Sequence, residues 1–180
     1  MIQVLKQPPP TDATARMAAI KGVQISPTVL ATQQGPEGHL GPEAAAALLM
    51  LQATFVEEQG AAEFWMRAAG LMELLATAPG FIRRFSFGEG VNSTLIALWR
   101  TAADARAFFS TDEHQAAMRD LFRHRWQYSH FAGLFEMPAP RHRVIFCQHC
   151  DGVTPVEHRV CRDCGRELFD PFLVQDDGNA

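Results

Sequence analysis

The stretch from Ser93 to Phe122 constrains the fold more than any other part of the chain. Its first residues alternate so that both faces of a strand are apolar, and a strand of this kind must be covered on both sides. One face carries Thr94, Ile96 and Leu98, and the other carries Leu95, Ala97 and Trp99. We therefore expect a central strand.

A helix is expected to follow this strand at once. Thr101 to Asp104 match the S/T-x-x-D/E capping pattern, in which a hydroxyl accepts from an unpaired helical N–H and an acid sits at the positive helix end. Ser110 to Asp112 predict a kink or restart. Beyond it, one helical face that should pack on the sheet carries His114, Ala117, Met118, Leu121, Phe122 and Arg125.

The rest of the central region adds three strands and one helix. Strands are expected over 45–56, 81–87 and 130–136, and a helix over 64–75 that stops before Pro79-Gly80. The order is βαββαβ. It predicts an α+β, ferredoxin-like fold with two helices on one face of a four-stranded antiparallel sheet.

The other face of that sheet predicts an oligomer. It would carry Leu48, Met50 and Val56, and burial against a second copy of the chain is the simplest way to keep them from water. We therefore expect a homodimer. Arg83 and Arg84 should project to opposite faces, so one of them points to the core or the dimer interface and needs a carboxylate partner.

Composition bounds the class of protein. With 180 residues, 47% of them hydrophobic, the chain can bury the core of one ordinary domain with a small appendage. A net charge of −4 disfavours nucleic acid and membrane surfaces as partners. No leader pattern or long apolar window is found, so we expect a cytoplasmic protein.

The expected division of the chain has four parts. Residues 1–43 form an N-terminal arm, partly irregular because of its prolines. Two alternatives are open for it: Val23–Ile25 and Thr28–Leu30 each add a short edge strand, or the arm wraps a partner subunit. Residues 44–138 form the ferredoxin-like domain and 139–172 a zinc ribbon. Residues 173–180 form a disordered tail.

Four cysteines give the most specific signal. Cys147, Cys150, Cys161 and Cys164 form C-x2-C-x10-C-x2-C, and two such knuckles can enclose one tetrahedral metal ion. Four thiolates leave no open position for water, so we expect structural Zn²⁺, with iron of the rubredoxin type as the alternative. His149 and His158 are then not needed as ligands, and no cysteine remains for catalysis.

Residues 45–136 resemble the dimeric α/β-barrel superfamily, which includes antibiotic biosynthesis monooxygenases and haem-degrading monooxygenases. The resemblance rests on APGFIRRFSF (78–87) and STLIALWRTAADARAFFSTDEHQAAMRDL (93–121). It implies a pocket between sheet and helices for a small aromatic or haem-like ligand. Haem-degrading members use an Asn, a Trp and a helix-borne His. Here His114 matches best, whereas Asn92 lies in a hairpin.

The resemblance implies candidate site residues and leaves the function open. His114 is the candidate catalytic base, and Trp99, Trp65, His130 and Arg83 are candidate ligand-binding residues. One hypothesis is a monooxygenase-like enzyme, either cofactor-free or with haem held by His114 or His130. The other is a non-enzymatic ligand-binding or protein-interaction module that uses the ribbon.

The segment from Arg123 to His130 is dense in cationic and aromatic side chains. These groups could contact an anionic or aromatic ligand through arginine forks and stacking. An exposed helix end, where cations complement the helix dipole, is the favoured interpretation.

Overall fold

The computed structural model describes residues 3–5 and 30–170. The predicted strand at Val23–Ile25, most of Thr28–Leu30 and the tail 173–180 lie outside these residues. The described elements are β1 (Gln3–Leu5), β2 (Leu30–Gln34), η1 (Pro42–Ala44), β3 (Ala47–Phe55), α2 (Glu58–Arg67), α3 (Ala69–Ala76), β4 (Phe81–Glu89), β5 (Asn92–Trp99), α4 (Ala102–Phe109), α5 (Asp112–Arg123), β6 (Gln127–Glu136), β7 (Val144–Phe146) and β8 (Val153–Pro155).

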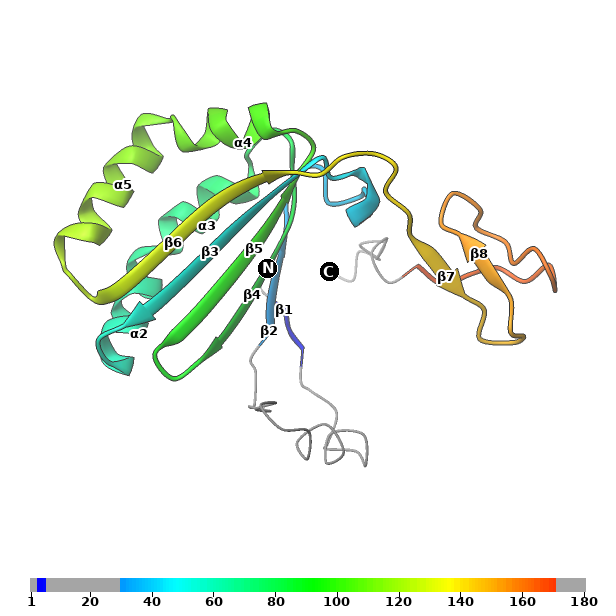
Figure 1. The fold of residues 1–180 in the computed structure, drawn as a ribbon, viewed down its shortest axis with the longest axis horizontal. Coiled ribbons are helices and arrows are strands. Elements are labelled where there is room, and N and C mark those ends of the chain that lie inside the picture. Colours follow the sequence, from blue (N-terminus) through cyan, green and yellow to red (C-terminus); the bar gives the residue numbers. More distant parts are fainter. Residues whose placement is uncertain (1–2, 6–29, 171–180) are drawn as a thin grey trace, which may run out of the picture.

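The main sheet has the order β1-β2-β4-β5-β3-β6, and all its neighbouring pairs are antiparallel. Its β4-β5-β3-β6 part is the ferredoxin-like arrangement, so the expected α+β fold class is confirmed. All four α-helices lie on one side of the sheet (Figure 1). We call residues 30–136 the α+β domain.

The predicted central strand and its cap are both found. β5 lies between β4 and β3, with Leu95, Ala97 and Trp99 buried under the helices. The Thr101 hydroxyl accepts from the Asp104 N–H at 3.0 Å and donates to the Asp104 carboxylate at 2.7 Å. After the break at Ser110, Thr111 caps α5 by accepting from the His114 N–H at 3.2 Å.

Three details differ from the sequence expectation. The first helix is divided into α2 and α3 at Ala68, and β6 begins at Gln127 rather than His130. β2 extends the sheet beyond β4, because Ala31 to Gln34 pair with Arg83 to Ser86.

In the described ranges 3–5 and 30–170, no helix combines the length and apolar character needed to cross a lipid bilayer.

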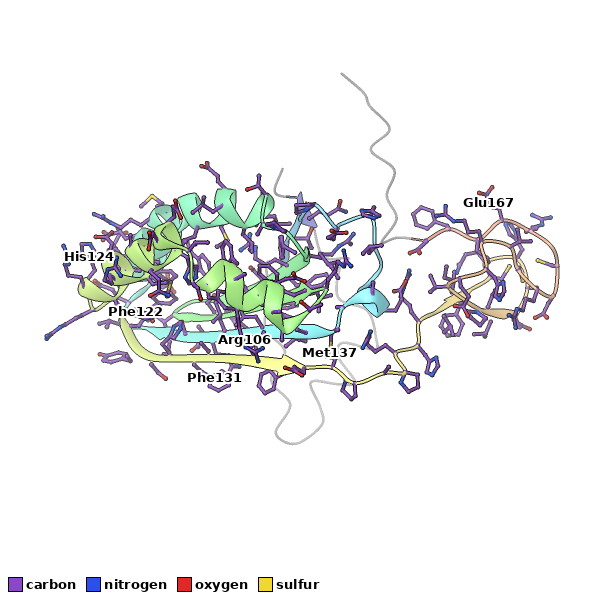
Figure 2. All side chains as sticks on the ribbon, turned by 90° about the horizontal axis from the view of Figure 1, so that it is seen from above. Arg106, Phe122, His124, Phe131, Met137 and Glu167 are labelled. Atoms are coloured by element: carbon purple, nitrogen blue, oxygen red, sulfur yellow. The ribbon has the colours of Figure 1, made fainter. Side chains whose placement is uncertain are left out.

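The two faces of the sheet are covered differently. The helix side buries the main core, whereas Phe131 and Phe135 on the opposite face are 45% and 48% exposed. Figure 2 shows Phe131 pointing away from the helical layer. Leu48 and Met50 share this face with them by register and are half-buried.

The second, smaller unit follows β6. β7 and β8 form a two-stranded antiparallel sheet, and Ile145, Cys147, Cys161 and Leu168 form its small core. We call residues 144–170 the ribbon; it projects beyond one end of the main sheet (Figure 1).

Candidate functional site

An apolar cavity of about 70 Å³ lies between the sheet and the helices. Its walls include Trp65 from α2, Trp99 from β5, His114 from α5 and His130 from β6. Four of the five residues predicted as catalytic or ligand-binding therefore meet in one cavity. The remaining lining is aliphatic and aromatic and includes Leu49, Leu51, Phe64, Leu71, Met72, Leu95, Ala97, Phe108, Met118 and Leu121.

Within residues 3–5 and 30–170, three buried nitrogens of this lining have no hydrogen-bond partner. They are Nε1 of Trp99, Nδ1 of His114 and Nδ1 of His130. Buried polar atoms are normally paired, because an unpaired one costs about 1–3 kcal/mol. This cavity therefore offers polar contacts that the protein itself does not use.

Both histidines are held neutral by their surroundings. Burial lowers the pKa of His114, opposed in part by a hydrogen bond to the Phe109 backbone, and burial also lowers the pKa of His130. Aromatic rings fix their positions. The imidazole of His114 lies 5.1 Å from the ring of Phe108, and that of His130 lies 5.1 Å from the ring of Phe122. A neutral, fixed imidazole can accept a proton.

Arg83 lies away from this cavity. It pairs with Leu98, on the face of the sheet opposite the helices, and it is not among the residues that line the cavity. Burial lowers its pKa, while the nearby Asp170 raises it, so Asp170 is the carboxylate that the sequence analysis expected. Its guanidinium also donates to the Gly38 carbonyl at 3.5 Å.

Arg84 is buried beside the cavity wall and is 3% exposed. It lies opposite Ala97 in the β4–β5 ladder, and cross-strand partners share a face of the sheet. Its NH1 donates to the Ser86 hydroxyl at 3.0 Å, its Nε has no partner, and burial lowers its pKa. A buried cation of this kind favours an anion nearby.

Asn92 does not take part in the cavity. It begins β5, and its Oδ1 accepts from the Thr54 hydroxyl at 3.1 Å at an exposed end of the sheet. The Asn, Trp and His set that the sequence resemblance implied for haem degradation is therefore not assembled in the described residues.

A second hollow, of about 350 Å³, adjoins the cavity and shares Leu121 and His130 with it. We call it the outer groove; its other lining residues are Phe122, Arg125, Trp126, Gln127, Tyr128 and Ser129. Most of this lining comes from the segment Arg123 to His130, which the sequence analysis named as a possible ligand contact but preferred to interpret as an exposed helix end. Gln127 was not singled out within it, and among the described residues its amide oxygen and nitrogen are both buried without partners.

The four cysteines converge as the spacing predicted. All four Sγ atoms lie within 4.8 Å of one another, with 3.6 Å between Cys147 and Cys164 and between Cys150 and Cys161. Zn–S bonds of about 2.3 Å in a tetrahedron require S–S distances of roughly 3.8 Å. The donor set therefore fits a zinc or iron ion, and it can hold one without any histidine.

Backbone geometry supports this metal site. A Cβ at Gly152 would lie 2.9 Å from the Cys161 Sγ and 3.1 Å from the Cys150 Sγ, so only glycine fits there. Gly165 has φ of +72°, the left-handed conformation that glycine adopts without strain. Backbone N–H groups of Cys164 and Asp163 lower the pKa of Cys161 to about 6, which favours a thiolate ligand.

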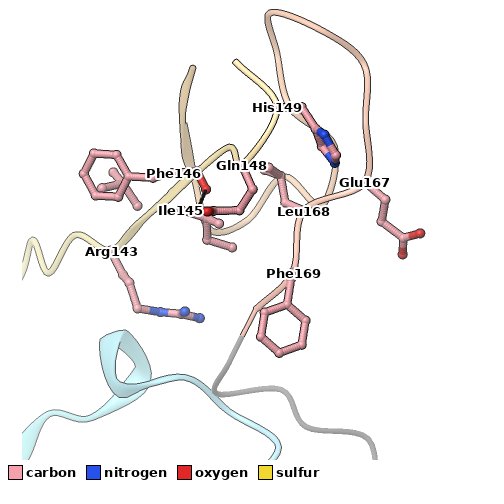
Figure 3. A pocket seen from close by; sticks show the side chains of 9 residues that line it. Arg143, Ile145, Phe146, Gln148, His149, Glu167, Leu168 and Phe169 are labelled. Carbon is pink, nitrogen blue, oxygen red and sulfur yellow. Dashed lines mark hydrogen bonds between the residues drawn. The ribbon is translucent and has the colours of Figure 1, made fainter. Parts of the chain in front are cut away.

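The ribbon also carries a surface groove of about 410 Å³ (Figure 3). Its apolar side chains include Phe146 and Phe169, which are 63% and 77% exposed. Arg143, Gln148, His149 and Glu167 supply its polar groups.

Fold and site together define a ferredoxin-like α+β protein with a ribbon whose four clustered cysteines could hold a metal ion. No protein-family model matches the chain, and no curated protein matches its sequence. Solved structures that resemble it include a Streptomyces coelicolor monooxygenase from the gene ActVA-Orf6, in complex with nanaomycin D, at 14% identity and a TM-score of 0.45. The match covers 54% of this chain and 92% of that one.

Two further structures resemble the same part of the chain. SnoaB, a cofactor-independent oxygenase from Streptomyces nogalater, matches at 20% identity and a TM-score of 0.44, over 52% of this chain and 94% of that one. A dimeric ferredoxin-like protein from an uncultured marine organism matches at 14% identity and a TM-score of 0.40, over 57% and 96%. Likeness at this level transfers no activity.

Proposed function

We propose that the cavity binds a small aromatic molecule and that the protein oxygenates it without a cofactor. The observation that carries the proposal is the set of three unpaired nitrogens, on Trp99, His114 and His130, in an otherwise apolar cavity. A pocket with few convergent polar groups and perturbed titratable residues is typical of a small-molecule site.

The proposed reaction begins with proton transfer to His114. The neutral imidazole accepts a proton from an acidic carbon of the substrate, and the positive charge of Arg84 stabilises the resulting enolate. The carbanion then reacts with O2 to a peroxide anion, which takes the proton back from His114 to give a hydroperoxide. The same carbon then loses its second proton while the O–O bond breaks, which releases water and leaves a carbonyl. One oxygen atom enters the product, and the substrate supplies the electrons that reduce the other to water.

Substrate entry requires the cavity to widen. Ligand sites usually measure roughly 300–1,000 Å³, whereas this cavity measures about 70 Å³. The helical cover is interrupted at Ala68 and at Ser110, and these breaks are where α2–α3 and α4–α5 can bend. Haem is larger still and the Asn is missing, so we derive no step through haem.

Two features complete the proposal. A homodimer would cover Phe131, Phe135, Leu48 and Met50 on the open face of the sheet. Structural Zn²⁺, bound by the four cysteines, would hold the ribbon together.

The test uses anthrone, an aromatic ketone with an acidic methylene group. We expect anthrone-dependent O2 uptake in a one-to-one ratio with the ketone consumed. His114→Ala should reduce the rate at least about 100-fold, the range of general-base contributions. His39→Ala is the matched control, because His39 is an exposed histidine outside the cavity. Equal rates in both variants would exclude His114 as the base.

The second candidate function is a non-enzymatic module whose ribbon contacts another protein. The exposed Phe146 and Phe169 in the ribbon groove favour it, since exposed apolar patches mark interaction sites. This candidate predicts no O2 uptake with any enolisable ketone. It also predicts that His114→Ala leaves a folded protein with unchanged binding partners.

A further inference from the structure

The outer groove carries two features that neither the fold nor the cavity requires. The amide of Gln127 is buried with both its oxygen and its nitrogen unpaired. Arg125, which lines the same groove, has φ of +52°. Non-glycine residues rarely adopt this left-handed conformation, and glycine or asparagine would normally be found there. Such costs are retained mainly where they serve a function.

The groove is rigidly built and continuous with the cavity. Its Trp126 ring is stacked on His124 at 4.4 Å and contacts the guanidinium of Arg67 at 5.7 Å. Leu121 and His130 belong to both hollows, so a ligand with one end in the cavity can extend its other end past them. Figure 2 shows Phe122 and His124 at the end of the α+β domain that is far from the ribbon.

Charge distinguishes this end from the opposite one. A hollow of about 290 Å³ meets the cavity at Phe108 and is lined by Asp104 and Glu113. The outer groove instead offers the Arg125 cation and the Gln127 amide. An anionic group is therefore favoured in the outer groove and repelled at the opposite hollow.

We propose that the outer groove is a specificity subsite that binds the anionic oxygen group of an aromatic acid, with Arg125 and Gln127 as its recognition residues. Gln127 donates from Nε2 to the carboxylate, Arg125 pairs with its charge, and Gln127 Oε1 accepts from a hydroxyl of the ligand. The apolar rings occupy the cavity beside His114 and Trp99. This inference rests on the proposed binding function of the cavity and adds the class of ligand to it.

The test compares 1-hydroxy-2-naphthoate with its methyl ester, followed by quenching of tryptophan fluorescence. The acid should bind about tenfold more tightly than the ester, and the difference should shrink at high salt. Arg125→Gly should weaken acid binding about tenfold and leave ester binding unchanged. Gln127→Leu should weaken acid binding about tenfold and ester binding by less, because the ester keeps the hydroxyl that Gln127 Oε1 accepts from. Arg123→Gly is the matched control, because Arg123 lies outside the groove. This variant should change neither the affinity for the acid nor the affinity for the ester.

Stability measurements separate recognition from a merely structural role. Gln127→Leu removes two unpaired buried atoms and Arg125→Gly removes a strained backbone position, so neither should lower the unfolding midpoint. Equal affinities for acid and ester, unchanged by both variants, would overturn the subsite and leave the cavity intact. Failure of both compounds to bind would overturn the subsite together with the proposed function.

Discussion

The α+β domain and the ribbon bury very different amounts of apolar surface. The domain encloses Trp99, Phe55 and Phe81 at 1% exposure or less, within two extended clusters. The ribbon core consists of two aliphatic side chains and two cysteines. Apolar burial can stabilise the first unit by itself, whereas the second lies below the size at which a core suffices, so we expect it to depend on a metal ion bound by its four cysteines.

Arg143 connects the two units. Its guanidinium donates to Glu43 of η1 at 2.6 Å and to Asp170, the last residue of the ribbon, at 2.7 and 2.6 Å. The hydrogen bond with Asp170 and then that with Glu43 raise its pKa against the effect of burial. Arg141 adds bonds to the Glu43 and Met137 carbonyls at 3.0 and 2.8 Å. The connection is therefore polar and separate from both cores.

Metal removal should have the largest effect and should act on one unit alone. We expect chelation, or Cys161→Ser, to unfold the ribbon, because structural zinc contributes about 10–16 kcal/mol to small metal-bound units. The α+β domain should stay folded. Its fluorescence reports this selectively, since Trp65, Trp99 and Trp126 are the three tryptophans of the chain.

The measurement combines metal content with hydrogen exchange of both units. Cys161→Ser should lose the metal and the exchange protection of β7 and β8, while β3 and β5 stay protected. Unchanged metal content would show that the four cysteines do not form the site. Simultaneous loss of the tryptophan signal would show instead that the α+β domain needs the ribbon to fold.

Breaking the connection should have an intermediate effect on both units. Arg143→Ala removes the ion pairs of the part-buried Glu43 carboxylate and of the buried Asp170 carboxylate with Arg143, with an expected cost of roughly 3 kcal/mol. Arg143→Lys is the matched variant, since it keeps the charge and loses the bidentate geometry. Denaturant unfolding followed by fluorescence and by metal release should show two separate transitions in Arg143→Ala. A single unchanged transition would show that the connection contributes nothing.

The parts of the fold that sequence predicted are those set by local chemistry. The alternation of β5, the cap at Thr101 and the restart at Thr111 each depend on residues within a few positions. The cysteine knuckles are local in the same sense, and their convergence followed from spacing alone. The cavity was expected between sheet and helices, and His114, His130, Trp65 and Trp99 do meet there.

The parts that sequence did not predict depend on register and on distant segments. Arg83 and Arg84 project to opposite faces as alternation predicted, but both are buried because both faces are covered there, and the Gly38 segment that contacts Arg83 is 45 residues away in sequence. Glu43 and Arg143 are 100 residues apart and meet only after the sheet is formed. The unpaired amide of Gln127 likewise becomes visible only once its neighbours are placed.

Acidification should have the smallest effect and should act on the α+β domain through its histidines. Burial lowers the folded-state pKa of His114 and His130 below the ordinary value of 6.5. Between the folded-state pKa and 6.5, the unfolded chain therefore binds more protons than the folded chain. The contribution of these neutral histidines to the free energy of unfolding is fully present above pH 6.5 and declines as the pH falls towards the folded-state pKa. Unfolding at pH 7.5 and 5.5, followed by tryptophan fluorescence, checks this expectation. All three tryptophans lie in the α+β domain, so acid release of a metal from the ribbon does not disturb the signal. The double variant His114→Gln/His130→Gln should flatten the decline, and an unchanged slope in that variant would assign it to other groups.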